Sequence, residues 1–84
     1  MLNKGDVVRS LAGRDKEKLL AVVSVSSEGV LVCDGKERPV ERPKRKNIRH
    51  VQATAQSLDP AELASNRALK KALARLNSES TVNT

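Results

Sequence analysis

Aromatic residues are absent from this chain of 84 residues, which contains no Phe, Tyr or Trp. Proteins that bind unpaired bases usually stack them on aromatic side chains, so the absence excludes an RNP-type sheet surface. It also excludes the aromatic-walled grooves that bind proline-rich peptides and the aromatic cages that bind methylated lysine. The core has to be built from Val, Leu, Ile and Ala, as in a small strand-built barrel or a short helical bundle.

Cysteine and histidine are scarce, with Cys33 and His50 the single examples of each. They cannot assemble a zinc site, which needs about four ligands, and one cysteine cannot form an internal disulfide, which fits a reducing cytosol. P-loop, GxGxxG and GxSxG motifs are missing. A Cys–His nucleophile pair is the remaining catalytic alternative, but Cys33 lies in an apolar strand, where cysteine is usually a core residue. We therefore expect a non-enzyme with no metal and no cofactor.

Long apolar runs are also missing, since none approaches the ~20 residues that span a bilayer. The N-terminal residues MLNKGDVV lack the apolar segment of a secretory signal. A basic helix could bind an anionic membrane surface, but this chain has no Trp or Phe to anchor one. These features predict a cytoplasmic protein that does not act at a membrane.

Positive charge is abundant, because 16 Lys and Arg face 10 Asp and Glu, for a formal net charge of +6. Such an excess on a small body attracts polyanions. Between Lys36 and Arg49 seven basic residues are offset only by Glu37 and Glu41, and a second basic group lies in residues 14–18. The candidate phosphate-binding residues are Arg14, Lys16, Lys18, Lys36, Arg38, Arg42, Lys44, Arg45, Lys46 and Arg49.

Lys44, Arg45 and Lys46 are the strongest of these candidates, since their density exceeds what solubility requires. A merely solvated charged surface is the alternative. Without aromatic platforms, binding has to act on phosphates and sugars, which favours duplexes and compact folded RNA and predicts a steep loss of affinity with salt. Charge alone does not separate RNA from DNA.

The first part of the chain has the pattern of short antiparallel strands. Apolar alternation and β-branched residues predict strands at Asp6–Ser10, Leu19–Val25 and Val30–Cys33. Asp34–Gly35 is typical of a hairpin turn. A weaker strand is expected around Arg38–Arg42, where Pro39 and Pro43 suggest an edge position or a loop, and a last strand within Ile48–Val51. Short strands at this spacing predict a mainly β protein with a small antiparallel barrel in residues 1–54.

The second part predicts one helix. Asp59 as N-cap, Pro60 at the first position and Glu62 completing a capping box mark its start, and it is expected to end at Leu76. Residues 55–78 then form a linker and the helix, and residues 79–84 a disordered tail. The apolar stripe of Leu69, Leu73 and Leu76 can pack on the barrel of the same chain, which is favoured, or on a protein partner.

Residues 5–25, GDVVRSLAGRDKEKLLAVVSV, resemble a KOW motif: a strand, a loop with glycine and basic residues, and a strand rich in Val and Ala. The resemblance continues through CDGKERPVERPKRKNIRHVQAT and covers roughly residues 4–54. Over this length the chain is similar to bacterial KOW-domain RNA-binding proteins related to a large-subunit ribosomal protein of archaea and eukaryotes. The resemblance implies an SH3-like barrel and RNA binding, often to ribosomal RNA.

The resemblance can be followed residue by residue. Gly13 matches the loop glycine; Arg14, Asp15, Lys16 and Lys18 match the polar loop; Asp34 and Gly35 match the turn; and residues 44–46 match the basic run. The chain departs from the motif at Glu17, where such loops commonly have a glycine that serves a positive φ. The expected function is non-enzymatic binding of structured RNA, ribosomal or ribosome-associated. The alternative is a protein-interaction module that docks on the transcription or translation machinery through the barrel and helix.

Overall fold

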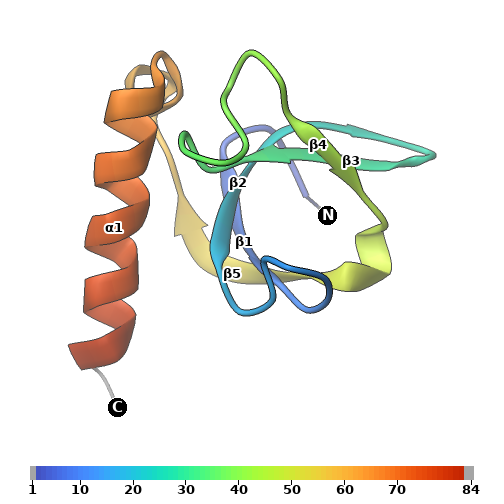
Figure 1. Ribbon diagram of the computed structural model, residues 1–84, viewed down its shortest axis with the longest axis horizontal. Coiled ribbons are helices and arrows are strands. Elements are labelled where there is room, and N and C mark those ends of the chain that lie inside the picture. The colour runs from blue at the N-terminus through green and yellow to red at the C-terminus, as the bar shows by residue number, and fades with distance from the viewer. Residues whose placement is uncertain (1, 83–84) are drawn as a thin grey trace.

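The computed structural model describes residues 2–82 and consists of one antiparallel sheet followed by one α-helix. The sheet has five strands in the order β4-β3-β2-β1-β5. Figure 1 shows the sheet curling on itself, with the helix along one side. The predicted mainly β architecture, a small antiparallel barrel with one C-terminal helix, is confirmed. The elements are β1 (Asp6–Ser10), β2 (Leu19–Ser26), β3 (Gly29–Cys33), β4 (Lys44–Lys46), η1 (Ile48–His50), β5 (Val51–Ser57), η2 (Pro60–Leu63) and α1 (Asn66–Val82), where η1 and η2 are short 3-10 helices.

The central strands bury both of their faces. On β2, Leu20 and Val22 belong to the cluster inside the curled sheet, while Leu19 and Ala21 belong to the cluster on its outer face. Val7 and Val8 divide in the same way on β1. Successive side chains of a strand point to opposite faces, so a continuous apolar strand needs cover on both sides. The helix supplies the outer cover.

The outer cluster joins the helix to the sheet. Leu69, Leu73 and Leu76 of α1 are all buried and pack with residues of the sheet that include Ala21 and Cys33. The stripe therefore packs on the barrel of the same chain, which was the favoured alternative. In the structure these three leucines, which were also candidates for a partner contact, are covered by the sheet of their own chain.

Two of the predicted strands are misplaced. Residues 38–42 form a loop, and the β4 strand instead spans Lys44–Lys46, where it pairs with β3. The loop is held by side chains: Asn66 Oδ1 accepts the Val40 amide hydrogen at 2.7 Å, and Asp34 Oδ1 accepts those of Lys36 and Arg38. Asp34 therefore starts a wide loop instead of a two-residue hairpin turn.

The last strand begins later than expected and is longer. Residues 48–50 form η1, and β5 runs from Val51 to Ser57, pairing with β1. Asn47 caps η1, since its side-chain oxygen accepts the Arg49 amide hydrogen at 2.9 Å. Only Val51 of β5 is buried, and the residues that follow it are small or polar, so the strand has no run of large apolar residues to mark it.

The helix is interrupted near its predicted start. The predicted capping box is present, with Glu62 Oε1 accepting the Asp59 amide hydrogen at 2.9 Å, but it opens the short helix η2. The α-helix begins at Asn66, after Ser65 accepts the Ala68 amide hydrogen on its hydroxyl. It continues to Val82, past the predicted end at Leu76. Of the predicted tail, residues 79–82 lie in this helix and residues 83–84 lie outside the described residues. Within residues 2–82, no helix is long and apolar enough to cross a membrane.

Candidate nucleic-acid interface

The loop between β1 and β2 is held closed by short hydrogen bonds. Its ends are joined by backbone hydrogen bonds from the Ser10 amide to the Lys18 carbonyl and from the Glu17 amide to the Ser10 carbonyl. Gly13 and Glu17 both have positive φ, +87° and +75°. Glu17 therefore adopts the left-handed backbone conformation that usually favours glycine.

A buried ion pair fixes this loop to β4. Lys46 Nζ lies 2.9 Å from Asp15 Oδ1 and donates to the Ala12 carbonyl at 3.0 Å. The two side chains are only 6% and 12% exposed. Ser10 Oγ also donates to Asp15 Oδ1, at 2.8 Å. Lys46 was predicted to bind phosphate, but its ammonium is committed to the interior, which corrects that assignment.

The ionisation of Asp15 follows from these contacts. Burial raises the pKa of Asp15, but hydrogen bonds from Lys46 and Ser10, with the charge of Lys46, outweigh burial and hold the pKa below its ordinary value. Asp15 therefore stays charged at neutral pH and neutralises Lys46. Its second oxygen, Oδ2, is buried and has no hydrogen-bond partner among the described residues. The loop and β4 are thus locked together by a pair that adds no net charge to the surface.

The loop between β3 and β4 carries a balanced set of charges. Within residues 34–42, Lys36, Arg38 and Arg42 are matched by Asp34, Glu37 and Glu41. Glu37 also pairs with Lys18 at 3.1 Å. Hydrogen bonds from Asn66 lower the pKa of Glu41, which stays ionised at neutral pH. Four of the predicted phosphate-binding residues, Lys18, Lys36, Arg38 and Arg42, therefore lie among carboxylates.

A mixed groove of about 350 Å³ runs between this loop and the helix. Three lysines and three carboxylates line it: Lys18, Lys36 and Lys70 with Glu17, Asp34 and Glu37. Since both signs of charge line the groove, a polyanion gains little electrostatic attraction there. We expect this side of the molecule to contribute little to phosphate binding.

Uncompensated positive charge gathers where residues 11–16 meet residues 44–50, a region called here the basic junction. Two contacts join its halves: the Leu11 amide donates to the His50 carbonyl at 2.8 Å, and Lys46 reaches the Ala12 carbonyl. The junction contains six Lys and Arg and a single acidic residue, Asp15. Once Lys46 and Asp15 cancel, the cations that remain are Arg14, Lys16, Lys44, Arg45 and Arg49.

Arg45 remains available despite a carboxylate neighbour. Its guanidinium lies 3.7 Å from Glu28, and both side chains are more than half exposed. Exposed pairs of this kind contribute about 0–1 kcal/mol, so a phosphate can displace the glutamate. Arg14, Lys16 and Arg49 are exposed, and no ion pair holds them within residues 2–82. The loop and the basic run therefore lie side by side, joined by the Leu11–His50 and Lys46–Ala12 hydrogen bonds.

The basic junction also contains apolar residues that the sequence did not single out as functional. Leu11 is 44% exposed and Ile48 is 52% exposed, although both are large aliphatic residues. Leu11 follows β1 directly, and Ile48 opens η1. The signal was present in the sequence, since Ile48 stands inside a basic run, but the predicted strand there assigned it to the core.

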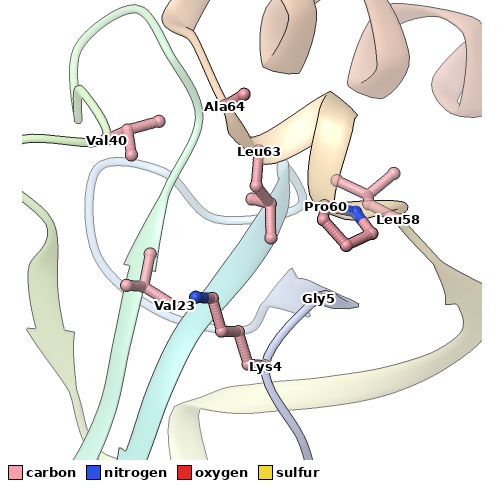
Figure 2. Close-up of a pocket in the computed structure, with 8 residues that line it drawn as sticks. All are labelled: Lys4, Gly5, Val23, Val40, Leu58, Pro60, Leu63 and Ala64. Atoms are coloured by element: carbon pink, nitrogen blue, oxygen red, sulfur yellow. The ribbon is translucent and has the colours of Figure 1, made fainter.

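An apolar hollow lies on another part of the molecule, between η2 and the outer face of the sheet. Its volume is about 450 Å³, and Figure 2 shows apolar side chains around it with the amino group of Lys4 directed toward Val23. The lining residues are Lys4, Gly5, Val23, Val40, Leu58, Pro60, Leu63 and Ala64. A single cation cannot hold a polyanion, so this hollow is separate in chemistry from the basic junction.

Cys33 and His50 do not form a catalytic pair. Cys33 is fully buried in the outer cluster, whereas His50 is exposed at the end of η1. Burial raises the pKa of the Cys33 thiol to about 11, with smaller effects from the charges of Asp34 and Glu41, so the thiol is not ionised at neutral pH. Among the described residues, no group of His, Cys, Asp or Glu could hold a metal ion.

No protein-family model matches this chain, and no curated protein matches it either.

Proposed function

We propose that this chain binds structured RNA without catalysing a reaction, and that the basic junction holds the RNA by its phosphates. The observation that carries the proposal is the cluster of five uncompensated cations, Arg14, Lys16, Lys44, Arg45 and Arg49, on two segments that a buried ion pair locks together. A fixed array of cations can bind successive phosphates at a lower entropic cost than cations on a mobile loop.

RNA is preferred over DNA because of the KOW resemblance of residues 4–54, not because of charge. The same resemblance makes ribosomal RNA, or another RNA of the translation machinery, the expected target, and the cytoplasm the expected location. Shape recognition follows from the missing aromatic residues, since the chain offers no platform on which to stack bases.

A matched pair of variants tests where the phosphates bind. Arg45→Gln/Arg49→Gln removes two charges from the basic junction, and Arg38→Gln/Arg42→Gln removes two from the balanced loop. Affinity for a folded RNA is measured by fluorescence anisotropy over a salt series, with a DNA duplex as a second probe. The junction variant should reduce the slope of log affinity against log salt by about 2, because each lost phosphate contact removes about one unit. Equal losses in the two variants, or binding that does not respond to salt, would overturn the proposal.

The apolar hollow of Figure 2 favours a second candidate function, the docking of a partner protein. Its apolar lining suits one large aliphatic side chain, and Lys4 suits an adjacent carboxylate, so the partner segment would carry a leucine next to a glutamate. Chemical-shift changes during titration with such a peptide should centre on Val23 and Val40. The variant Lys4→Glu should abolish them, and changes of equal size in that variant would exclude this mode of docking.

A further inference from the structure

Three large apolar side chains are exposed on the described surface, and two of them lie in the basic junction. Leu11 and Ile48 belong to the junction, and Val25 lies outside it on β2. Single exposed aliphatic residues are common on protein surfaces and need no explanation. Here two of them lie among the cations of the basic junction, on two segments that contact each other in the fold. A ligand bound there would meet apolar groups as well as positive charge.

Both side chains stand on backbone that is held in place. Ile48 opens a short helix whose first turn is capped by Asn47, with hydrogen bonds of 2.9 Å to Arg49 and 2.8 Å to His50. Leu11 is held by the bond from its amide to the His50 carbonyl at 2.8 Å. The next residue, Ala12, accepts from Lys46. An apolar group on a fixed support can enter a ligand without the cost of ordering a loop.

A continuous RNA duplex offers no apolar surface to these side chains. Its bases are stacked and covered, and its outside presents phosphates and 2′-hydroxyl groups. Apolar surface appears where stacking is interrupted, at a bulge, an internal loop or a helix end. Proteins that bind the DNA minor groove insert Leu and Ile between base steps and partially unstack them at a cost in free energy, a cost that is avoided where the bases are already unstacked. The cations around Leu11 and Ile48 select a polyanion as the occupant of this surface.

We propose that Leu11 and Ile48 pack against bases exposed at an interruption of an RNA helix, while the cations of the basic junction hold the flanking phosphates. This inference rests on the proposed function and makes it more specific. The aliphatic pair takes the place of the aromatic platforms that the chain lacks, with two differences. It covers less base surface, and it requires bases that are already unstacked.

The test compares two RNAs that differ only in one interruption. Anisotropy titrations with the full chain use a continuous RNA duplex and the same duplex carrying a two-nucleotide bulge. The wild-type chain should bind the bulged RNA about tenfold more tightly, a difference of about 1.4 kcal/mol. The variant Leu11→Ser/Ile48→Ser should reduce this preference to about twofold or less, while its affinity for the continuous duplex and its salt dependence stay unchanged.

Val25→Ser is the matched control, since Val25 is 39% exposed and lies outside the junction. It should leave the preference for the bulge intact. All three residues are exposed, so the variants should keep the thermal stability of the parent, which a melting curve verifies. The inference is overturned if the wild-type chain binds both RNAs equally, or if the preference survives in the double variant. A different outcome overturns the proposed function itself: neither RNA binds in a salt-dependent way.

Discussion

Replacement of Lys46 by Met should destabilise the protein more than replacement of any exposed lysine. Lys46 is 7% exposed, and its ammonium is the only cation bonded to Asp15 among the described residues. The variant leaves a buried carboxylate with the Ser10 hydroxyl as its remaining side-chain donor. Removing one partner of a buried pair costs about 3–5 kcal/mol, because the remaining charge is uncompensated.

That loss is large for a chain of this size. A domain of 84 residues has a free energy of unfolding of about 4–13 kcal/mol. Lys18→Met is the matched control, since its ion pair with Glu37 is more than half exposed and is worth about 0–1 kcal/mol. Met preserves the length of the lysine stem in both variants, so the comparison isolates the ammonium group.

The effect should depend on pH in a defined direction. The pKa of Asp15 is lowered in the folded protein, so the stability that its ionisation contributes is present above the unfolded pKa of about 3.9 and is lost as pH falls through the lowered value. In Lys46→Met the burial remains and the main opposing contacts are gone, so protonation of Asp15 relieves the penalty. The difference in stability between the two proteins should therefore be largest near neutral pH and should shrink as the pH falls, first as Asp15 of the variant is protonated and then as Asp15 of the wild type is.

Urea denaturation monitored by circular dichroism measures these differences. The double variant Asp15→Asn/Lys46→Met completes a thermodynamic cycle, and its coupling energy should be about 1 kcal/mol or more. A loss below about 1 kcal/mol in Lys46→Met, or a difference that grows in acid, would refute the account of a buried pair. Under conditions where it is folded, the double variant should bind RNA as the wild-type chain does, since the buried Lys46 ammonium is not among the five cations proposed to hold phosphates.

Three further results are expected. Glu17→Gly should raise the free energy of unfolding by about 1 kcal/mol, because φ is +75° at this residue, whereas Glu17→Ala should not; equal melting temperatures for the two variants would contradict this. Leu69→Ala should lower the free energy of unfolding by about 2–5 kcal/mol, because Leu69 is fully buried between α1 and the sheet. Its control, Ala74→Ser at an exposed position, should change the free energy of unfolding by less than about 0.5 kcal/mol. Similar denaturation midpoints for Leu69→Ala and Ala74→Ser would mean that the helix does not pack on the sheet through Leu69. The Cys33 thiol, with its pKa raised to about 11 and its side chain fully buried, should resist iodoacetamide at neutral pH until urea unfolds the chain, and rapid labelling of the folded protein would show that it is accessible.

Local patterns in the sequence predicted most of the architecture. Alternation placed β1 at its observed bounds and β2 and β3 to within a residue at one end, because their apolar residues face a core on one side or both. The failures share a cause. β4 consists of basic residues and β5 mainly of small and polar ones, so their strand conformation depends on pairing with β3 and β1. The break between η2 and α1 depends on the Ser65 cap. The apolar pattern of the helix, which extends over more residues, led to the prediction of one continuous helix instead.

The composition of the chain already determined the type of interface to expect, because the absence of aromatic residues and the excess of Lys and Arg exclude base stacking and favour phosphates. Only the tertiary structure decided which cations are free. Lys46 and Asp15 are 31 residues apart in the chain and 2.9 Å apart in the fold. The loop of residues 34–42 carries its own carboxylates, whereas residues 44–49 meet residues 11–16, whose single acid, Asp15, is already neutralised by Lys46. Electrostatic interaction depends on distance in space and on burial. The sequence therefore gives the number of charges in a basic run but not which of them are available to a ligand.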